Sequence, residues 1–292
     1  VVPTASYACE LWGWHAIPTT TSGVTSKTLE KDFLTMLRRI VGVRSTVKTD
    51  IFLTELGVVP LRLQWLKRMV TFWNALVQLP ENHLYAQVLR DSCHYGVTSR
   101  SSSWAGSFMV AVRSIGYPYL IDCREPHPID MESFRVLLAR AHKLPDQVHI
   151  SPRLTPRDPL LCTYVRWFGT PTALQRSRLL CLPVDVRRVR TFFKFRLGVH
   201  DLPIDIGRRT GLSRDSRTCD MCGNAVGDEH HFIFHCPALN SLRQQFSWLF
   251  SSGSYSLRKF IWQADLVGVV NFVHEGFQVR AAVLRTRGFG SD

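Results

Sequence analysis

The sequence predicts a mainly α-helical protein. Apolar residues recur at steps of three and four along several stretches, which is the spacing of a buried helix face. No stretch alternates apolar and polar residues with a period of two, and no segment repeats, so a large sheet is not expected. Segments rich in proline, glycine and serine separate the periodic stretches. We therefore expect two helical units, divided within residues 96–130.

Four predicted helices lie in the first third of the chain. The first ends at Gly42, which can take the left-handed conformation that closes a helix. The second is short and ends at Gly57. The third begins near Pro60, which suits a first turn, and ends at Pro80. Helices joined by such short loops are typical of a small bundle. Their predicted ranges are residues 28–42, 50–56, 60–79 and 81–94.

The remainder of the chain predicts further helices between irregular segments. Asp130 is a good N-cap, Pro171 and Pro183 suit first turns, and Gly198 follows the last periodic residue of one helix. Glycine, serine or proline residues gather in the expected loops, which are residues 96–103, 117–128 and 145–159. The predicted helices span residues 104–115, 130–141, 160–168, 171–181, 183–197, 239–250 and 265–284.

The totals limit the class of protein. The chain has 292 residues, enough for one or two domains with a packed core, and 45% of them are hydrophobic. No apolar run reaches the ~18–20 residues that a membrane span needs. The chain begins with Val1 and has no signal segment, so we expect a fragment of a longer protein. Five of its cysteines are scattered singly, which favours reduced intracellular thiols.

Cysteines and histidines gather within residues 218–237 in the pattern C-x2-C-x8-H-x4-C. Two cysteines separated by two residues can point both sulfurs at one ion, and Gly223 and Gly227 let the chain turn back. Four nitrogen or sulfur donors are the ligand set of a closed structural zinc site. The preferred ligands are Cys219, Cys222, His231 and Cys236.

The same stretch contains a second ligand set. His230 and His235 also lie between the second and third cysteines, so His235 could replace Cys236 beside Cys219, Cys222 and His231. Spacing does not decide between the two sets, because both are accepted zinc ligands. The alternative without a metal is that the thiols are free in a reducing compartment and the histidines lie on the surface.

Basic residues give the chain a formal net charge of +13, which predicts a polyanionic partner, in the first place nucleic acid. Nine basic and three acidic residues between positions 187 and 217 give a local charge of +6 directly before the cysteines. Arginine forks onto phosphate oxygens. The alternative is an inert basic surface of solvated helix faces. The nine predicted binding residues are Arg187, Arg188, Arg190, Lys194, Arg196, Arg208, Arg209, Arg214 and Arg217.

Three segments carry a resemblance to a known family. They read FKFRLGVHDLPIDIGR at residues 193–208, RTCDMC at residues 217–222 and EHHFIFHCP at residues 229–237. In this order they resemble the C-terminal segment of animal non-LTR retrotransposon (LINE) reverse transcriptases. In that family the histidine that opens H-F-x-F-x-C-P and the cysteine that closes it are metal ligands. The resemblance therefore implies His231 and Cys236 as ligands.

The resemblance also implies a division of the chain. Residues 1–24 resemble the end of the polymerase palm, and residues 25–95 resemble the thumb, with E-L-G-x-x-P-L at residues 55–61. Residues 96–180 would be a helical connector, and residues 181–292 a basic C-terminal domain with a CCHC zinc knuckle. The parent would be an RNA-directed DNA polymerase in a ribonucleoprotein of the nucleus and cytoplasm. The remainder of the reverse transcriptase would then be a partner in the same polypeptide.

No catalytic residue is predicted in this chain. A reverse transcriptase holds two metal ions at a Tyr- or Phe-x-Asp-Asp turn, and the sequence has no Asp-Asp pair. It also has no glycine-rich phosphate loop and no H-E-x-x-H. We expect a non-enzymatic portion that grips template RNA or target DNA around a structural zinc ion, away from membranes. The alternative is a zinc-stapled protein-interaction module, such as a host protein derived from an element.

Overall fold

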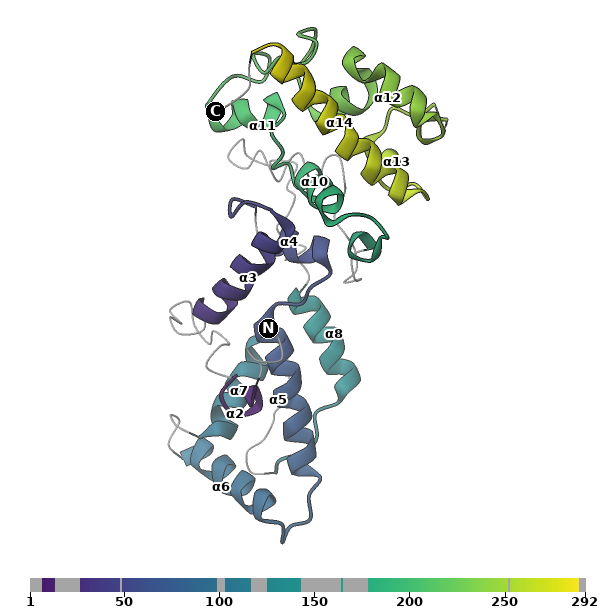
Figure 1. Ribbon diagram of the computed structural model, residues 1–292. Coiled ribbons are helices and arrows are strands. Elements are labelled where there is room, and N and C mark those ends of the chain that lie inside the picture. Colours follow the sequence, from purple (N-terminus) through teal and green to yellow (C-terminus); the bar gives the residue numbers. More distant parts are fainter. Residues whose placement is uncertain are drawn as a thin grey trace. The chain divides into compact units, whose positions relative to one another are not determined.

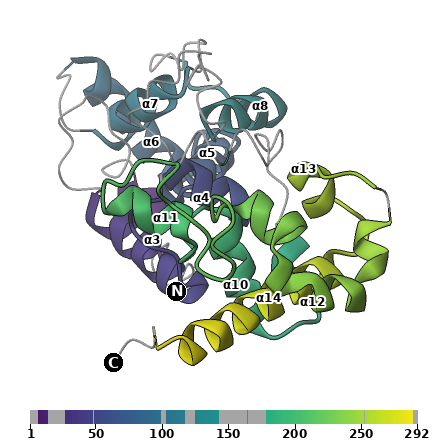
Figure 2. The ribbon, with the colours of Figure 1, turned by 90° about the horizontal axis from the view of Figure 1, so that it is seen from above.

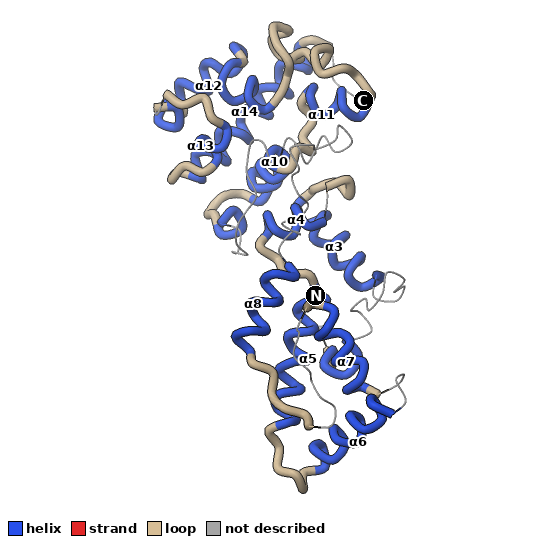
Figure 3. The backbone as a smooth tube through the Cα atoms, turned by 180° about the vertical axis from the view of Figure 1, so that it is seen from behind, coloured by secondary structure: helices blue, strands red, loops and turns tan. Residues whose placement is uncertain are grey.

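The computed structural model describes residues 7–13, 27–47, 49–98, 103–116, 125–142, 164, 178–251 and 253–288. Within these ranges the backbone forms helices joined by loops, and Thr218 and Val226 form an isolated antiparallel bridge (Figure 3). The predicted mainly helical fold class is confirmed.

The chain divides into two compact units, the first of residues 1–36 and 58–151, the second of residues 37–57 and 152–292. The division predicted within residues 96–130 is therefore wrong, and residues 37–57 belong with the C-terminal part of the chain. Helix α4 (Thr49–Leu56) shows the reason, because the buried carboxylate of Glu55 pairs with Arg196 at 2.6 Å. Periodicity identifies the apolar face of a helix but not the element that the face packs on. The division into palm end, thumb, connector and C-terminal domain, which the resemblance implies, stays a prediction.

Helices of the first unit begin at or close to the residues predicted to start them. Pro60 immediately precedes α5. Residues 81–83 form a turn in which the amide of His83 donates to the carbonyl of Pro80 at 2.9 Å, so α6 begins later than predicted. The carboxylate of Asp130 accepts the amide of Ser133 at 2.8 Å and caps α8. The helices of this unit are α2 (Cys9–Trp12), α5 (Leu61–Val77), α6 (Leu84–Thr98), α7 (Trp104–Ser114) and α8 (Met131–His142), and α3 (Lys27–Val41) begins in it.

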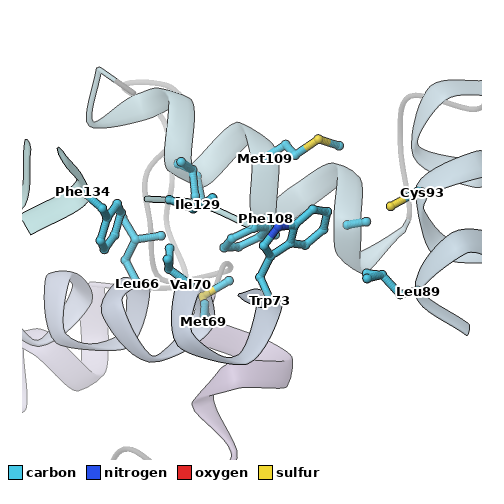
Figure 4. Packing of buried hydrophobic residues seen from close by; sticks show 13 residues of the cluster. Leu66, Met69, Val70, Trp73, Leu89, Cys93, Phe108, Met109, Ile129 and Phe134 are labelled. Atoms are coloured by element: carbon cyan, nitrogen blue, oxygen red, sulfur yellow. The ribbon is translucent and has the colours of Figure 1, made fainter. Parts of the chain in front are cut away.

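An apolar cluster drawn from α5, α6, α7 and α8 forms the core of the first unit (Figure 4). The fully buried Trp73 stacks on Phe108 with ring centroids 5.1 Å apart, and its Nε1 donates to the carbonyl of His127 at 3.0 Å. The side-chain amide of Asn74 exchanges two hydrogen bonds of 2.8 Å with the backbone of Ile129. Aromatic packing thus holds α5 to α7, and the side-chain hydrogen bonds of Trp73 and Asn74 hold α5 to the backbone of the segment before α8.

The second unit is arranged around α14, which packs against α10, α12 and α13 (Figures 1 and 2). A Cβ atom on Gly276 of α14 would lie 2.7 Å from Cζ of Phe232, so only glycine allows this close approach. The contact seats residues 231–235 directly against α14. The helices of this unit are α4, α10 (Val186–Arg196), α11 (Pro203–Arg209), α12 (Asn240–Gln245), α13 (Leu257–Ile261) and α14 (Leu266–Thr286).

Several predicted boundaries are confirmed and others are wrong. Gly42 and Gly57 have φ values of +72° and +63° and end α3 and α4, as predicted. The predicted helix over 239–250 is interrupted, since a 3-10 turn over Ser247–Phe250 follows α12. Helices α11 and α13 were not predicted, because they are shorter than two helical turns. The predicted helix over 160–168 and most of that over 171–181 lie outside the described residues.

Candidate metal centre

Four side chains of the second unit converge on one point. Their sulfur and nitrogen atoms all lie within 4.8 Å of one another, and three of the four residues are buried. Sγ of Cys219 lies 3.8 Å from Sγ of Cys236, and Sγ of Cys222 lies 3.3 Å from Nε2 of His231. This group of three cysteines and one histidine could hold a metal ion, and it is the set that the sequence preferred.

A hairpin presents the first two cysteines. The amide of Cys219 donates to the carbonyl of Ala225 at 2.7 Å, and the amide of Gly223 donates to the carbonyl of Cys219 at 2.7 Å. Gly223 has a φ of +74°, which turns the chain back directly after Cys222. The hairpin closes where the amide of Gly227 meets the carbonyl of Arg217 at 2.8 Å. Both thiols therefore lie on one side of a short loop.

A single π-helical turn over His231–His235 presents the other two donors. The amide of Cys236 donates to the carbonyl of His231 at 2.8 Å, an i to i+5 hydrogen bond. Asp228 caps the turn, because its carboxylate accepts the amide of His231 at 2.9 Å. The wide turn brings His231 and Cys236 to the same side.

The structure decides between the two ligand sets. His235 is exposed and stacks on Tyr255, with ring centroids 5.4 Å apart, whereas Cys236 is fully buried beside Cys219. His230 also points elsewhere, donating from Nε2 to the carbonyl of Tyr255 at 2.8 Å. The cysteine, and not His235, completes the group of donors.

Two of the thiols shift each other's pKa in opposite directions. The hydrogen bond with Cys236 lowers the pKa of Cys219, and the same hydrogen bond together with burial raises the pKa of Cys236. Cys219 is therefore the thiol of the pair that loses its proton more easily, and the thiolate is the form that would bind a metal ion.

Two side-chain contacts that the sequence did not predict fix the centre to its surroundings. Nε2 of the buried His200 donates to the carboxylate of Glu229 at 2.9 Å, two residues before the candidate ligand His231. Arg280 of α14 holds Asp220, the residue after the candidate ligand Cys219, through Nε at 3.0 Å. The adjacent motifs E-H-H and C-D-M-C were visible in the sequence, but their partners lie 29 and 60 residues away along the chain.

Four of the nine predicted nucleic-acid-binding residues are engaged inside the second unit. Arg196 is 4% exposed and pairs with the buried Glu55, so binding a phosphate there would break a buried ion pair. Arg208 also pairs with a buried carboxylate, that of Asp205. Arg188 contacts Asn271 and Glu275 of α14, and Arg217 donates to the carbonyls of Leu212 and Ile204.

Of the other five predicted residues three are exposed, whereas Arg190 and Lys194 are half-buried. Arg187 is exposed, and the side chains of Arg209 and Arg214 are 45% and 56% exposed, although each contacts an aspartate. Arg190 donates from Nε to the carbonyl of Ile40 at 2.6 Å at the end of α3, and Lys194 lies beside Gly42. The basic run is thus not one continuous binding face, because about half of its side chains make contacts within the second unit.

Comparisons of this chain with models of protein families, with curated proteins and with solved structures find no match. Among the helices of the described ranges, none has both the length and the apolarity that crossing a bilayer requires.

Proposed function

We propose that this chain is the C-terminal portion of a non-LTR retrotransposon reverse transcriptase. In this proposal it grips RNA or DNA around a structural zinc ion and contains no catalytic centre. The convergence of three cysteines and one histidine in the predicted pattern carries the proposal. The net charge of +13 supports a polyanionic ligand. The resemblance of residues 193–237 to the family is the reason for proposing a reverse transcriptase as the parent enzyme.

Zinc is the ion that fits the four donors best. Two sulfurs bound at about 2.3 Å to one tetrahedral zinc ion lie about 3.8 Å apart, and a sulfur and an imidazole nitrogen lie about 3.5 Å apart. The corresponding distances here are 3.8 Å and 3.3 Å. Soft thiolate ligands also favour zinc over magnesium or calcium. Four protein ligands leave no open position, so the ion would be structural and not catalytic.

The metal centre would hold exposed cations in fixed positions. Arg214 lies in the loop before the hairpin and pairs with Asp228, the cap of the ligand turn, at 2.7 Å. Arg209 is the last residue of α11. The first turn of the same helix is joined to the hairpin, because the amide of Ile204 donates to the carbonyl of Gly227 at 3.2 Å. Ordering these groups before binding lowers the entropic cost of gripping a phosphate backbone.

Salt-dependent binding tests this proposal. Fluorescence anisotropy with labelled single-stranded RNA, single-stranded DNA and duplex DNA should show affinity that falls about tenfold or more between about 50 and 200 mM salt. Arg214→Ala and Arg209→Ala should each reduce the slope of log affinity against log salt, because each removes a cation. Arg196→Met should leave the slope unchanged, because Arg196 is buried. Absence of binding at every salt concentration would refute the proposal.

The second candidate function is a zinc-stapled module that binds protein, in a host gene derived from an element. Exposed aromatic residues of the second unit favour it, since Trp248 and Tyr255 are 54% and 64% exposed. An apolar protein interface keeps its affinity as salt rises, whereas phosphate binding does not. The same titration therefore distinguishes the two functions.

A further inference from the structure

An open cleft lies beside the metal-ligand turn of the second unit. Its volume is about 410 Å³, which is within the range of small-ligand sites. None of its residues belongs to the predicted basic run, and none is a ligand of the candidate metal centre. Its lining includes the side chains of Phe234, Asn240, Arg243, Gln244, Phe250 and Tyr255.

Tyr255 forms an exposed aromatic wall of the cleft. Its side chain is 64% exposed, yet its position is fixed from three directions. His235 stacks on the ring at an interplanar angle of 22°, and Phe234 meets it edge to face at 5.7 Å. Nε2 of His230 donates to the backbone carbonyl at 2.8 Å. An aromatic ring held in place but open to solvent is a surface on which a nucleobase stacks.

Two side-chain amides line the same cleft. Oδ1 of Asn240 accepts a hydrogen bond from Arg243 at 2.5 Å. Its amide nitrogen donates to no other residue in the described ranges, so two donors are open to a ligand. Gln244 is exposed, and its amide makes no hydrogen bond to another described residue. An amide presents a donor and an acceptor side by side, which matches the hydrogen-bonding edge of a base.

Two further basic residues, outside the predicted basic run, follow Tyr255 in the sequence. Arg258 and Lys259 come three and four residues after Tyr255, are exposed, and pair with no carboxylate in the part of the chain that the structure describes. Their helix, α13, packs on the cleft through Phe260, whose ring lies 5.8 Å from that of Phe234. Exposed cations on a helix next to the cleft are the groups that we expect to contact phosphates beside a bound base.

We propose that this cleft binds one unpaired base of a single-stranded nucleic acid. Tyr255 stacks on the base, the amides of Asn240 and Gln244 contact its edge, and Arg258 and Lys259 contact the neighbouring phosphates. The inference rests on the proposed function. It adds that the chain prefers single-stranded to double-stranded nucleic acid, because a paired base inside a duplex cannot enter the cleft.

Three variants of the full chain test the cleft with labelled single-stranded RNA, single-stranded DNA and the matching duplex. Tyr255→Ala should weaken single-strand binding by roughly 5- to 150-fold, the effect of one lost base stack, without changing the salt slope. Gln244→Ala should weaken it by roughly 2- to 10-fold, the effect of one hydrogen bond. Arg258→Ala combined with Lys259→Ala should reduce the salt slope by about 1.4.

Controls separate loss of the cleft from loss of the fold. Tyr255→Phe should bind like the unaltered chain, and so should Tyr85→Ala, which removes a ring that is 60% exposed in the first unit. Metal content and duplex affinity should stay the same in Tyr255→Ala. RNA and DNA strands that differ in affinity would assign the cleft to the tighter one.

The outcomes distinguish the inference from the proposed function. Strong salt-dependent binding by the unaltered chain, with Tyr255→Ala and Gln244→Ala both unchanged, would overturn the cleft and leave the proposed function standing. Equal losses of single-strand and duplex affinity in Tyr255→Ala would also overturn the cleft. No binding of any oligonucleotide by the unaltered chain would overturn both.

Discussion

The two units of this chain are held together by different kinds of contact. The first unit has an apolar cluster in which Trp73 of α5 stacks on Phe108 of α7, and α6 and α8 contribute further buried residues. The second unit adds a Cys3His group and buried polar contacts, such as the ion pair of Glu55 with Arg196 and the hydrogen bond of His200 with Glu229. Apolar burial requires neither a bound ion nor a charged group. The second unit, in contrast, contains four side chains that could hold a metal ion, and buried groups that can carry charge.

Removing the metal should have the largest effect and should affect the second unit alone. Binding of a structural zinc ion by a small site is worth of order 10 kcal/mol, and most of it is folding free energy. A chelator should therefore remove hydrogen-exchange protection from residues 214–240 and leave the amides of α5 and α7 protected. Loss of protection in both units would show that the proposed difference between them is wrong.

Ligand variants sharpen the same comparison. Cys236→Ser should lose the metal and bind nucleic acid more weakly, whereas His230→Ala and His235→Ala should each retain the metal. Metal content of the three purified variants is the measurement. Metal kept by Cys236→Ser but lost by His235→Ala would establish the set of two cysteines and two histidines.

Trp73→Ala should damage the first unit in the way that chelation damages the second. It removes a fully buried ring from the apolar cluster, and such truncations destabilise a fold by about 3–5 kcal/mol. Hydrogen exchange should speed up in α5 and α7, while metal content stays unchanged. Tyr85→Ala, at an exposed position, should shift stability by no more than about 0.5 kcal/mol. A Trp73→Ala protein that loses metal would show that the units do not fold independently.

Acid should weaken the second unit through Glu229. Burial raises the pKa of this carboxyl, but the hydrogen bond from His200 and the charge of Arg208 outweigh it, so the pKa lies below its usual value. A lowered carboxyl pKa adds stability above the unfolded-state pKa of about 4.3, and the contribution disappears as pH falls through the folded value.

Glu229→Gln isolates this contribution. It should cost about 1–3 kcal/mol near neutral pH, because it removes a charged partner of a buried hydrogen bond. Urea unfolding at a series of pH values should show the difference from the unaltered chain shrinking below about pH 4. A difference that is constant down to about pH 3 would mean that Glu229 does not titrate with a lowered pKa.

A matched pair of glycines gives the smallest effect. Gly223 and Gly116 have φ values of +74° and +84°, and a Cβ atom would meet nothing within 4 Å at either. Alanine at each therefore costs only backbone strain, about 1–2 kcal/mol. Gly223→Ala should weaken metal affinity several-fold, and Gly116→Ala should leave it unchanged. Competition with a metal indicator dye measures both, and equal losses would contradict the assignment of the two units.

Local features of the fold were predictable because they depend on neighbours in the chain. Gly42 and Gly57 end helices in the left-handed conformation, and the carboxylate of Asp130 caps α8. The C-x2-C turn and the spacing to His231 and Cys236 likewise act within one short stretch. The interruption of the predicted helix over 239–250 was not predictable, because packing on α14 sets the end of α12.

The sequence by itself determined the helical class, most helix positions in the first unit and the candidate metal ligands, since periodicity, caps and donor spacing are short-range properties. Only the tertiary structure decided which of these residues meet. It excluded His235 from the donors by stacking its ring on Tyr255. It also moved residues 37–57 into the second unit and buried Arg196 against Glu55, whose pairing joins positions 141 residues apart. Contacts at such separations follow from how whole faces pack, which no local pattern specifies.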